Sequence, residues 1–296
     1  MSEERSARYA PKIDVQKFLA RLPLHLVIVL IVVIWLVPSL GVFVNSVRIP
    51  REIRSSGWWT AADNLFAAET WTLENYEAVL DAQGMARSFL NSLIITIPAT
   101  LIPILIASFA AFAFAWMEFP LRLALFSIVV GLLVVPLQMT FVPVFRAYAN
   151  VGLTGTFPAI WLAHTGYGLP FAVYLLRNFF GALPKDLFES AFLDGASYQQ
   201  SFFYLALPLS VPSLASLAIF QFLWVWNDLL VALIYLGGTP RVAPLTVRVA
   251  NLVNSLGADW HLLPAAAVIS MLLPMIIFLA LQKYFVRGIL AGSVKG

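Results

Sequence analysis

The chain has 296 residues, of which 61% are hydrophobic and only 11% are charged, and its formal net charge is +3. A soluble domain carries about 25% charged residues, and a water-soluble fold of this length could not hide so much apolar surface. The composition therefore excludes an ordinary soluble protein and predicts an all-α chain that crosses a membrane several times.

Missing residue types and motifs exclude several kinds of chemistry. The sequence has no cysteine and three histidines, and it contains neither an HExxH zinc motif nor a GxxxxGK[ST] phosphate-binding loop. Its basic residues are scattered or terminal, unlike a nucleic-acid-binding patch. We therefore expect no metal, cofactor or nucleic acid on this chain, and any ATP with its magnesium would have to be bound by another polypeptide.

Six stretches are long and apolar enough to cross a bilayer, which takes about 20 residues. They cover residues 22–47, 89–116, 121–145, 158–180, 205–236 and 262–286. The preceding residues 1–21 form a tail in which residues 13–21 fit either a short interfacial helix or a plain polar segment. Residues 287–296 are expected to form a second tail.

Basic residues set the predicted orientation in the membrane. Five lysines and arginines lie in the first tail, and Lys283, Arg287 and Lys295 lie at the other end. Lys and Arg accumulate in cytoplasmic segments, and six spans return the chain to its starting side, so both termini are predicted to be cytoplasmic. Residues 181–204 then form a long internal loop.

This internal loop predicts two short helices joined by a glycine. Asp186 is the expected N-cap of the first helix, with Glu189 completing a capping box. The helix should end at Asp194 and Gly195, because glycine accepts a positive φ. A second short helix then runs toward Pro208, where the fifth span is expected to begin.

Large apolar side chains occur in this loop although water should surround it. They are Leu187, Phe188, Phe192 and Leu193, with the small residues Ser190, Ala191 and Ala196 among them. Such a mixture favours docking into a groove of another protein.

Residues 184–208 resemble the EAA loop of ABC importer permeases, which has Glu-Ala-Ala, then a Gly, then Leu-Pro. Glu189, Ala191, Gly195, Leu207 and Pro208 match its spacing, while Ser190 replaces the first Ala. The resemblance implies a type I permease fold with six spans, and a transporter subunit rather than an enzyme.

In that family the elbow is a coupling helix that sits in a cleft of the ATPase subunit. The resemblance implies that Glu189 faces a basic residue there and that Gly195 sets the bend. A role for Glu189 in capping only its own helix is the alternative. The ATPase-coupling residues implied are Glu189, Ser190, Ala191, Asp194, Gly195 and Ala196.

The C-terminal tail is similar to that of the smaller permease of maltose-type importers. There the tail reaches between two ATPase subunits, which implies this role for Gly292, Ser293, Val294 and Lys295, with a frayed end as the alternative. Residues 222–228 look most like alpha-glucoside permeases. The implied partners are a second homologous permease, an ATPase dimer, an extracytoplasmic sugar-binding protein, a sugar and membrane lipid.

Polar side chains inside the spans indicate a path for the solute, because a central Asp costs about 2.5–3.5 kcal/mol in a bilayer. Gln221, Trp224 and Asp228 are expected on one face of the fifth span, flanked by Asn227. His164 of the fourth span is expected in the same layer as Asp228.

Glycines and a proline near His164 are expected to break the fourth span, as at other transport sites. They are Gly166, Gly168 and Pro170. Amides, carboxylates and aromatic rings suit the hydroxyls and C–H faces of a sugar. The predicted set either lines the outward cavity or binds the companion permease: His164, Tyr167, Gln221, Trp224, Asn227 and Asp228.

The sequence thus predicts the permease subunit of an ABC importer for a sugar, an alpha-glucoside or a similar oligosaccharide. An ABC permease for another solute, such as an amino acid or a phosphonate, is one alternative. An ion-driven secondary transporter would need buried carboxylates, and Asp228 is the only acidic residue well inside a predicted span. An intramembrane enzyme would need paired carboxylates, a Ser/His couple or metal ligands within the spans, and His164 alone gives it little support.

Overall fold

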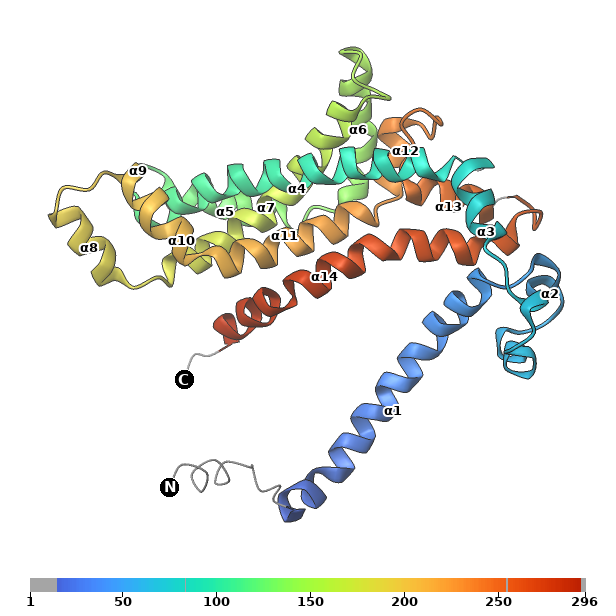
Figure 1. The fold of residues 1–296 in the computed structure, drawn as a ribbon. Helices are drawn as coiled ribbons and strands as arrows, with labels where there is room; N and C mark the ends of the chain where they lie inside the picture. Colours follow the sequence, from blue (N-terminus) through green and yellow to red (C-terminus); the bar gives the residue numbers. More distant parts are fainter. Residues whose placement is uncertain (1–14, 83, 254, 294–296) are drawn as a thin grey trace, which may run out of the picture.

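The computed structural model describes residues 15–82, 84–253 and 255–293, and helices dominate it (Figure 1). These ranges contain no strand, and their one extended pairing is an isolated bridge between Arg48 and Trp71. The all-α prediction is confirmed. The α-helices are α1 (Val15–Ser46), α2 (Pro50–Ser55), α3 (Glu74–Glu77), α4 (Met85–Trp116), α5 (Arg122–Leu132), α6 (Leu137–Asn150), α7 (Phe157–Gly181), α8 (Lys185–Leu193), α9 (Tyr198–Ser201), α10 (Leu207–Leu209), α11 (Val211–Trp226), α12 (Leu230–Leu236), α13 (Leu245–Val253) and α14 (Leu263–Ser293).

Helices α4, α7, α11 and α14 run lengthwise in one bundle, with α4 packed along α7 and α11 packed against both α4 and α14 (Figure 1). Helices α8 and α9 lie at one end of the bundle, and α2, α3 and α13 lie at the opposite end. Helix α1 leaves this opposite end beside α14 and diverges from the bundle. Its Val15 end and the Ser293 end of α14 both point toward the end that carries α8.

Small side chains allow α4 and α7 to approach closely. Ala99 and Ala107 of α4 are completely buried, and Ala163 and Ala172 of α7 are almost completely buried. Small residues at a helix interface bring two backbones into contact, which favours association inside a bilayer. This seam holds α4 and α7 together along the bundle.

Four helical segments are long and apolar enough to cross a membrane, and two bent pairs raise the number to six if each pair is one span. The four are Arg21–Ser46, Met85–Trp116, Phe157–Gly181 and Trp260–Lys283. They coincide with the predicted spans at residues 22–47, 89–116, 158–180 and 262–286.

The predicted span at residues 121–145 is bent. Helices α5 and α6 occupy it and meet at an angle of 99°. Pro136 explains the break, because proline lacks an N–H for the helical ladder and pushes Val135 away from the α conformation. In Figure 1 helix α6 stands across the direction of the bundle.

The predicted span at residues 205–236 is also divided. The helical segments Tyr198–Leu209 and Val211–Trp226 meet at 73°, on either side of Ser210. Pro208 and Pro212 flank this bend, and each removes a backbone donor from the ladder.

A second break follows α11 and contradicts the single helical face predicted for Gln221, Trp224 and Asp228. Helix α11 ends at Trp226, so Asp228 lies beyond it. The carboxylate of Asp228 accepts hydrogen bonds from the backbone N–H groups of Val231 (3.3 Å) and Ala232 (3.0 Å). It therefore caps the start of α12, because the first N–H groups of a helix have no partner within it.

The two predicted tails are partly helical. Residues 15–21 are the first turns of α1 and form no separate helix. Helix α14 continues to Ser293, so residues 287–293 extend the last helix. Residues 1–14 and 294–296 lie outside the described residues.

A buried arginine organises the segment after α1. Arg48 is completely buried, and a buried charge is tolerated when it is paired and hydrogen-bonded. Its guanidinium donates to Asn45 Oδ1 (3.1 Å), Gly57 O (3.1 Å), Glu52 Oε2 (3.1 Å), Ser56 Oγ (2.8 Å) and Thr60 Oγ1 (3.2 Å). These bonds hold the segment from Asn45 to Thr60 together as one unit.

We expect Arg48→Met to lower the free energy of unfolding by about 3 kcal/mol, because Glu52 and several hydroxyl groups lose their charged donor. Arg51→Met, at an exposed position, should stay within about 0.5 kcal/mol of the unchanged protein. Unfolding in mixed micelles with increasing dodecyl sulfate measures both. Equal stability of the two variants would contradict a structural role for Arg48.

Candidate functional site

The elbow at residues 184–208 is a helix, a glycine and a second helix, as predicted. Helix α8 ends at Leu193 with Asp194 as its C-cap, and Gly195 has a φ of +84°, a conformation that glycine adopts at little cost. Helix α9 follows at Tyr198 and continues as one π-helical turn (Phe202–Ala206) into α10.

The predicted capping box at Asp186 and Glu189 is wrong. Pro184 occupies the N-cap of α8, and Asp186 lies in the first helical turn. The capping box is found instead at α9, where Ser197 and Gln200 exchange hydrogen bonds. Glu189 is exposed and has no hydrogen-bond or ion-pair partner among the described residues, so its carboxylate is available to another molecule.

Two of the apolar side chains expected to be exposed in the elbow are anchors within the chain. Phe188 is completely buried and stacks on Trp116 at the end of α4, with ring centroids 3.9 Å apart. Phe192 is partly buried and packs edge-on against Tyr198. Leu193 remains exposed over 89% of its surface. The elbow is thus attached to the bundle on one face and free on the other.

An open hollow of about 360 Å³ lies along the elbow. Ala191, Asp194, Gly195 and Ala196, all predicted coupling residues, line it together with residues of α9 and the π-helical turn. Small side chains at these positions keep the hollow open, which suits the insertion of a partner's side chain.

We expect Phe188→Ala to lower the free energy of local opening of the elbow by about 3 kcal/mol, because it removes a buried aromatic ring. Leu193→Ala removes an exposed side chain and should change this free energy by less than about 0.5 kcal/mol. Amide hydrogen exchange over residues 185–209 measures both. Slow exchange in the Phe188 variant would show that the ring does not anchor the elbow.

A second candidate site is a pocket of about 300 Å³ between α7 and α11. Three predicted pathway residues, Tyr167, Gln221 and Trp224, line it. Its other lining residues are Gly168, Phe171 and Phe220. Sequence reasoning missed Phe171 and Phe220 as lining residues, although each is four positions from a predicted one and therefore shares its helical face.

Helix α7 is continuous, which corrects the expectation that Gly166, Gly168 and Pro170 interrupt it. Pro170 lies inside the helix, and membrane helices tolerate proline because neighbouring groups satisfy the freed carbonyl. Gly168 has a different role. A Cβ atom there would lie only 2.6 Å from Nε2 of Gln221, so glycine makes room for the amide.

The amide of Gln221 is held in a fixed orientation. Its Nε2 donates to the carbonyl of Ala99 on α4 at 3.2 Å, and the side chain is almost completely buried. The amide therefore connects α11 to α4 across the space that Gly168 leaves.

His164 and Asp228 lie together, but neither lines the pocket. His164 Nε2 is 3.7 Å from Asp228 Oδ2, which is beyond hydrogen-bond distance. Neither ring nitrogen of His164 has a hydrogen-bond partner within the described ranges. The imidazole meets the ring of Trp224 edge-on, with centroids 5.1 Å apart. Asn227 turns back to the carbonyl of Leu223 on its own helix.

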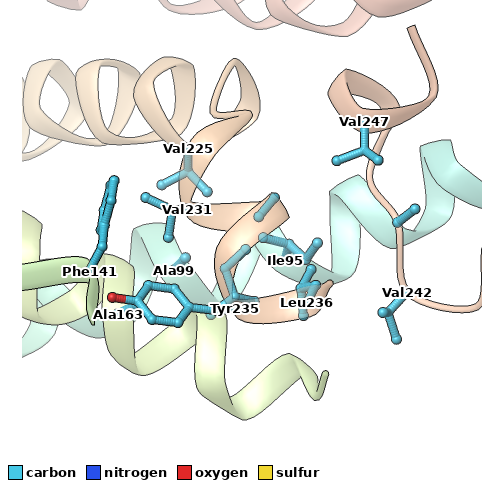
Figure 2. Close-up of a cluster of buried hydrophobic side chains, with 13 residues drawn as sticks. Ile95, Ala99, Phe141, Ala163, Val225, Val231, Tyr235, Leu236, Val242 and Val247 are labelled. Atoms are coloured by element: carbon cyan, nitrogen blue, oxygen red, sulfur yellow. The ribbon is translucent and has the colours of Figure 1, made fainter. Parts of the chain in front are cut away.

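Tyr167 connects the pocket to α6 and α12. Its hydroxyl accepts a hydrogen bond from Thr140 (3.0 Å) and forms another with the hydroxyl of Tyr235 (2.6 Å). Figure 2 shows Tyr235 and Phe141 in one buried cluster with residues of α4, α7 and α11. Sequence reasoning missed Thr140 and Tyr235, because no local pattern marks a contact between helices this far apart in the chain.

Comparisons with known proteins agree with this architecture. Residues 103–291 match the family described as "Binding-protein-dependent transport system inner membrane component". The chain is 58% identical over 279 residues to the osmoprotective compounds uptake permease protein GgtD of Synechocystis sp., covering 94% of each. It is 56% identical over 231 residues to the alpha-glucoside transport system permease protein AglG of Rhizobium meliloti, covering 76% of this chain and 61% of AglG.

Two solved structures share the fold. One is a bacterial ABC transporter involved in the import of the acidic polysaccharide alginate, with a TM-score of 0.73, 18% identity, and coverage of 93% of this chain and 100% of that chain. The other is a bacterial alginate ABC transporter in complex with an alginate pentasaccharide-bound periplasmic protein, with a TM-score of 0.61, 18% identity, and coverage of 90% and 94%.

Proposed function

Because the chain belongs to the family of binding-protein-dependent transport system inner membrane components, we propose that it is the permease subunit of an ABC importer for a sugar. The solute we propose is an alpha-glucoside or a related oligosaccharide. The exposed helix–glycine–helix elbow supports the importer assignment most strongly, since it lies within the matched residues and leaves one face free for a partner.

The proposed solute class rests on the relatives. AglG is named for alpha-glucoside transport, and GgtD is named for the uptake of osmoprotective compounds. The pocket between α7 and α11 adds aromatic rings and one amide, which suit a neutral, hydroxyl-rich solute. Charged amino acids or phosphonates would require an ionic partner that this pocket lacks among its lining residues.

The energy source we propose is a separate ATPase dimer that grips the elbow through Glu189 and the hollow beside Gly195. A second homologous permease would supply the other half of the pore, and an external binding protein would deliver the solute. Closure of the ATPases would pull the two elbows together and open the spans outward. Both chain ends are proposed to be cytoplasmic. The first end of α1 and the last end of α14 point toward the end of the bundle that carries α8, which supports this.

The C-terminal contact with the ATPase remains a proposal. Gly292 and Ser293 are the last described residues of α14. Val294 and Lys295 lie outside the described residues. The length of α14 supports the proposal, since the helix extends past the predicted end of the last span toward the end that carries the elbow.

Combining Glu189→Lys with Gly195→Pro should abolish ATP-driven uptake while the chain still inserts and co-purifies with its companion permease. Lysine would repel a basic partner, and proline cannot adopt the φ of +84° found at this position. Glu118→Lys is the matched control, because Glu118 is an exposed acid outside the elbow. Uptake at the unchanged rate in the double variant would contradict the proposed coupling role of the elbow.

The solute class can be tested on the external protein that co-purifies with the complex. Calorimetric titration should show binding of alpha-glucosides with a Kd of about 1 μM, giving a binding free energy of about −8 kcal/mol. The panel should also contain osmoprotective compounds, amino acids and phosphonates. Binding of amino acids or phosphonates in place of sugars would reject the sugar assignment and keep the importer assignment.

A further inference from the structure

We propose that the pocket between α7 and α11 is a saccharide-binding subsite on this subunit, with Trp224 as its stacking surface and Gln221 as its polar contact. The inference rests on the proposed sugar import. It adds that this chain itself holds one ring of the solute during passage.

The pocket lies at the right depth for a transport site. Ala99, whose carbonyl binds Gln221, lies near the middle of α4, and Gly168 lies near the middle of α7. In transporters of several folds the solute binds near the midplane of the bilayer, between spans. Small residues where the helices meet leave space at this level.

The walls of the pocket present flat aromatic surface. Phe171, Phe220 and Trp224 are exposed over 42%, 44% and 38% of their surfaces. The C–H face of a pyranose ring packs on such a surface, whereas sugar hydroxyls require polar partners. The volume of about 300 Å³ is at the lower end of the range of about 300–1,000 Å³ for small-molecule sites. The pocket therefore suits one sugar ring rather than a whole oligosaccharide.

The single amide is placed for recognition. Nε2 of Gln221 is engaged by Ala99, and Oε1 accepts no hydrogen bond from the described residues. Because the carbonyl of Ala99 fixes the orientation of the Gln221 amide, Oε1 is left to accept a hydrogen bond from a sugar hydroxyl. A polar group that is already held in place loses little entropy when a ligand binds.

Trp224 is also held in place, by His164 on the neighbouring helix. The imidazole is completely buried and meets the indole edge-on, with ring centroids 5.1 Å apart. Its ring nitrogens have no hydrogen-bond partner among the described residues. We assign His164 as a positioning residue, which fixes the angle of the stacking ring and does not itself touch the solute.

Gly168→Ala in the complete importer, reconstituted in liposomes with its loaded binding protein, tests the subsite. The new methyl group must displace the Gln221 amide, since its place is 2.6 Å from Nε2. Sugar moved per ATP hydrolysed should fall about tenfold, because a solute that is not held escapes back during the cycle. Gly166→Ala is the matched control on the same helix, since a Cβ atom there meets nothing within 4 Å.

Variants of Trp224 provide an independent test of the subsite. Trp224→Leu should lower the same ratio, since leucine is apolar but not flat, and Trp224→Phe should restore most of it. The wild-type ratio in both Gly168→Ala and Trp224→Leu would overturn the subsite. A proportional fall of uptake and hydrolysis would also overturn it, because a purely structural role leaves the ratio unchanged.

Three further outcomes separate this inference from others. Loss of the companion permease on purification of Gly168→Ala would show that the pocket is a subunit interface, and would overturn the subsite. A wild-type importer that hydrolyses ATP but takes up no alpha-glucoside would overturn the proposed function and the subsite with it. Normal alpha-glucoside uptake with unaffected pocket variants would overturn the subsite alone.

Discussion

The close packing of α4 on α7 determines where the functional features of this chain lie. Completely buried alanines at this seam bring two long helices together, and each candidate site is built on one of them. At one end of α4, Trp116 stacks on Phe188 and so fixes the position of the elbow. At mid-length, Ala99 of α4 and Gly168 of α7 together fix the amide of Gln221. A larger side chain in the seam would therefore disturb both sites, although neither contains the substituted residue.

The breaks between helices also have to satisfy the hydrogen-bonding needs of the backbone. Inside a bilayer each free backbone group needs an internal partner, so every break must be satisfied locally. At the end of α11 the carboxylate of Asp228 provides this by accepting from two N–H groups of α12. Between α10 and α11 the backbone N–H of Ser210 reaches back to the carbonyls of Ala206 and Leu207. At these two breaks the backbone N–H groups thus find hydrogen-bond partners within the chain.

The sequence predicts the helical class, the family and four of the spans, because apolar length and the spacing around Glu189 and Gly195 are local properties. It does not predict the breaks at Pro136 and Ser210. The mean hydropathy of a segment of about 20 residues does not register that a proline removes one backbone N–H from the helix. The sequence also does not predict that Phe188 is buried, because Trp116, which covers it, is distant in sequence. Asp228 was assigned to the wrong helical face because its role is decided by the N–H groups that follow it.

A chain of hydrogen-bonded hydroxyl groups through Tyr167 limits how α7 can move relative to its neighbours. Thr140, Tyr167 and Tyr235 come from three helices and are joined by bonds of 3.0 and 2.6 Å. Rotation of α7 by itself would pull these oxygens apart in an apolar surrounding, where unpaired hydroxyl groups are costly. We therefore expect α6, α7 and α12 to move together, with bending at the helix breaks near Pro136 and Ser210.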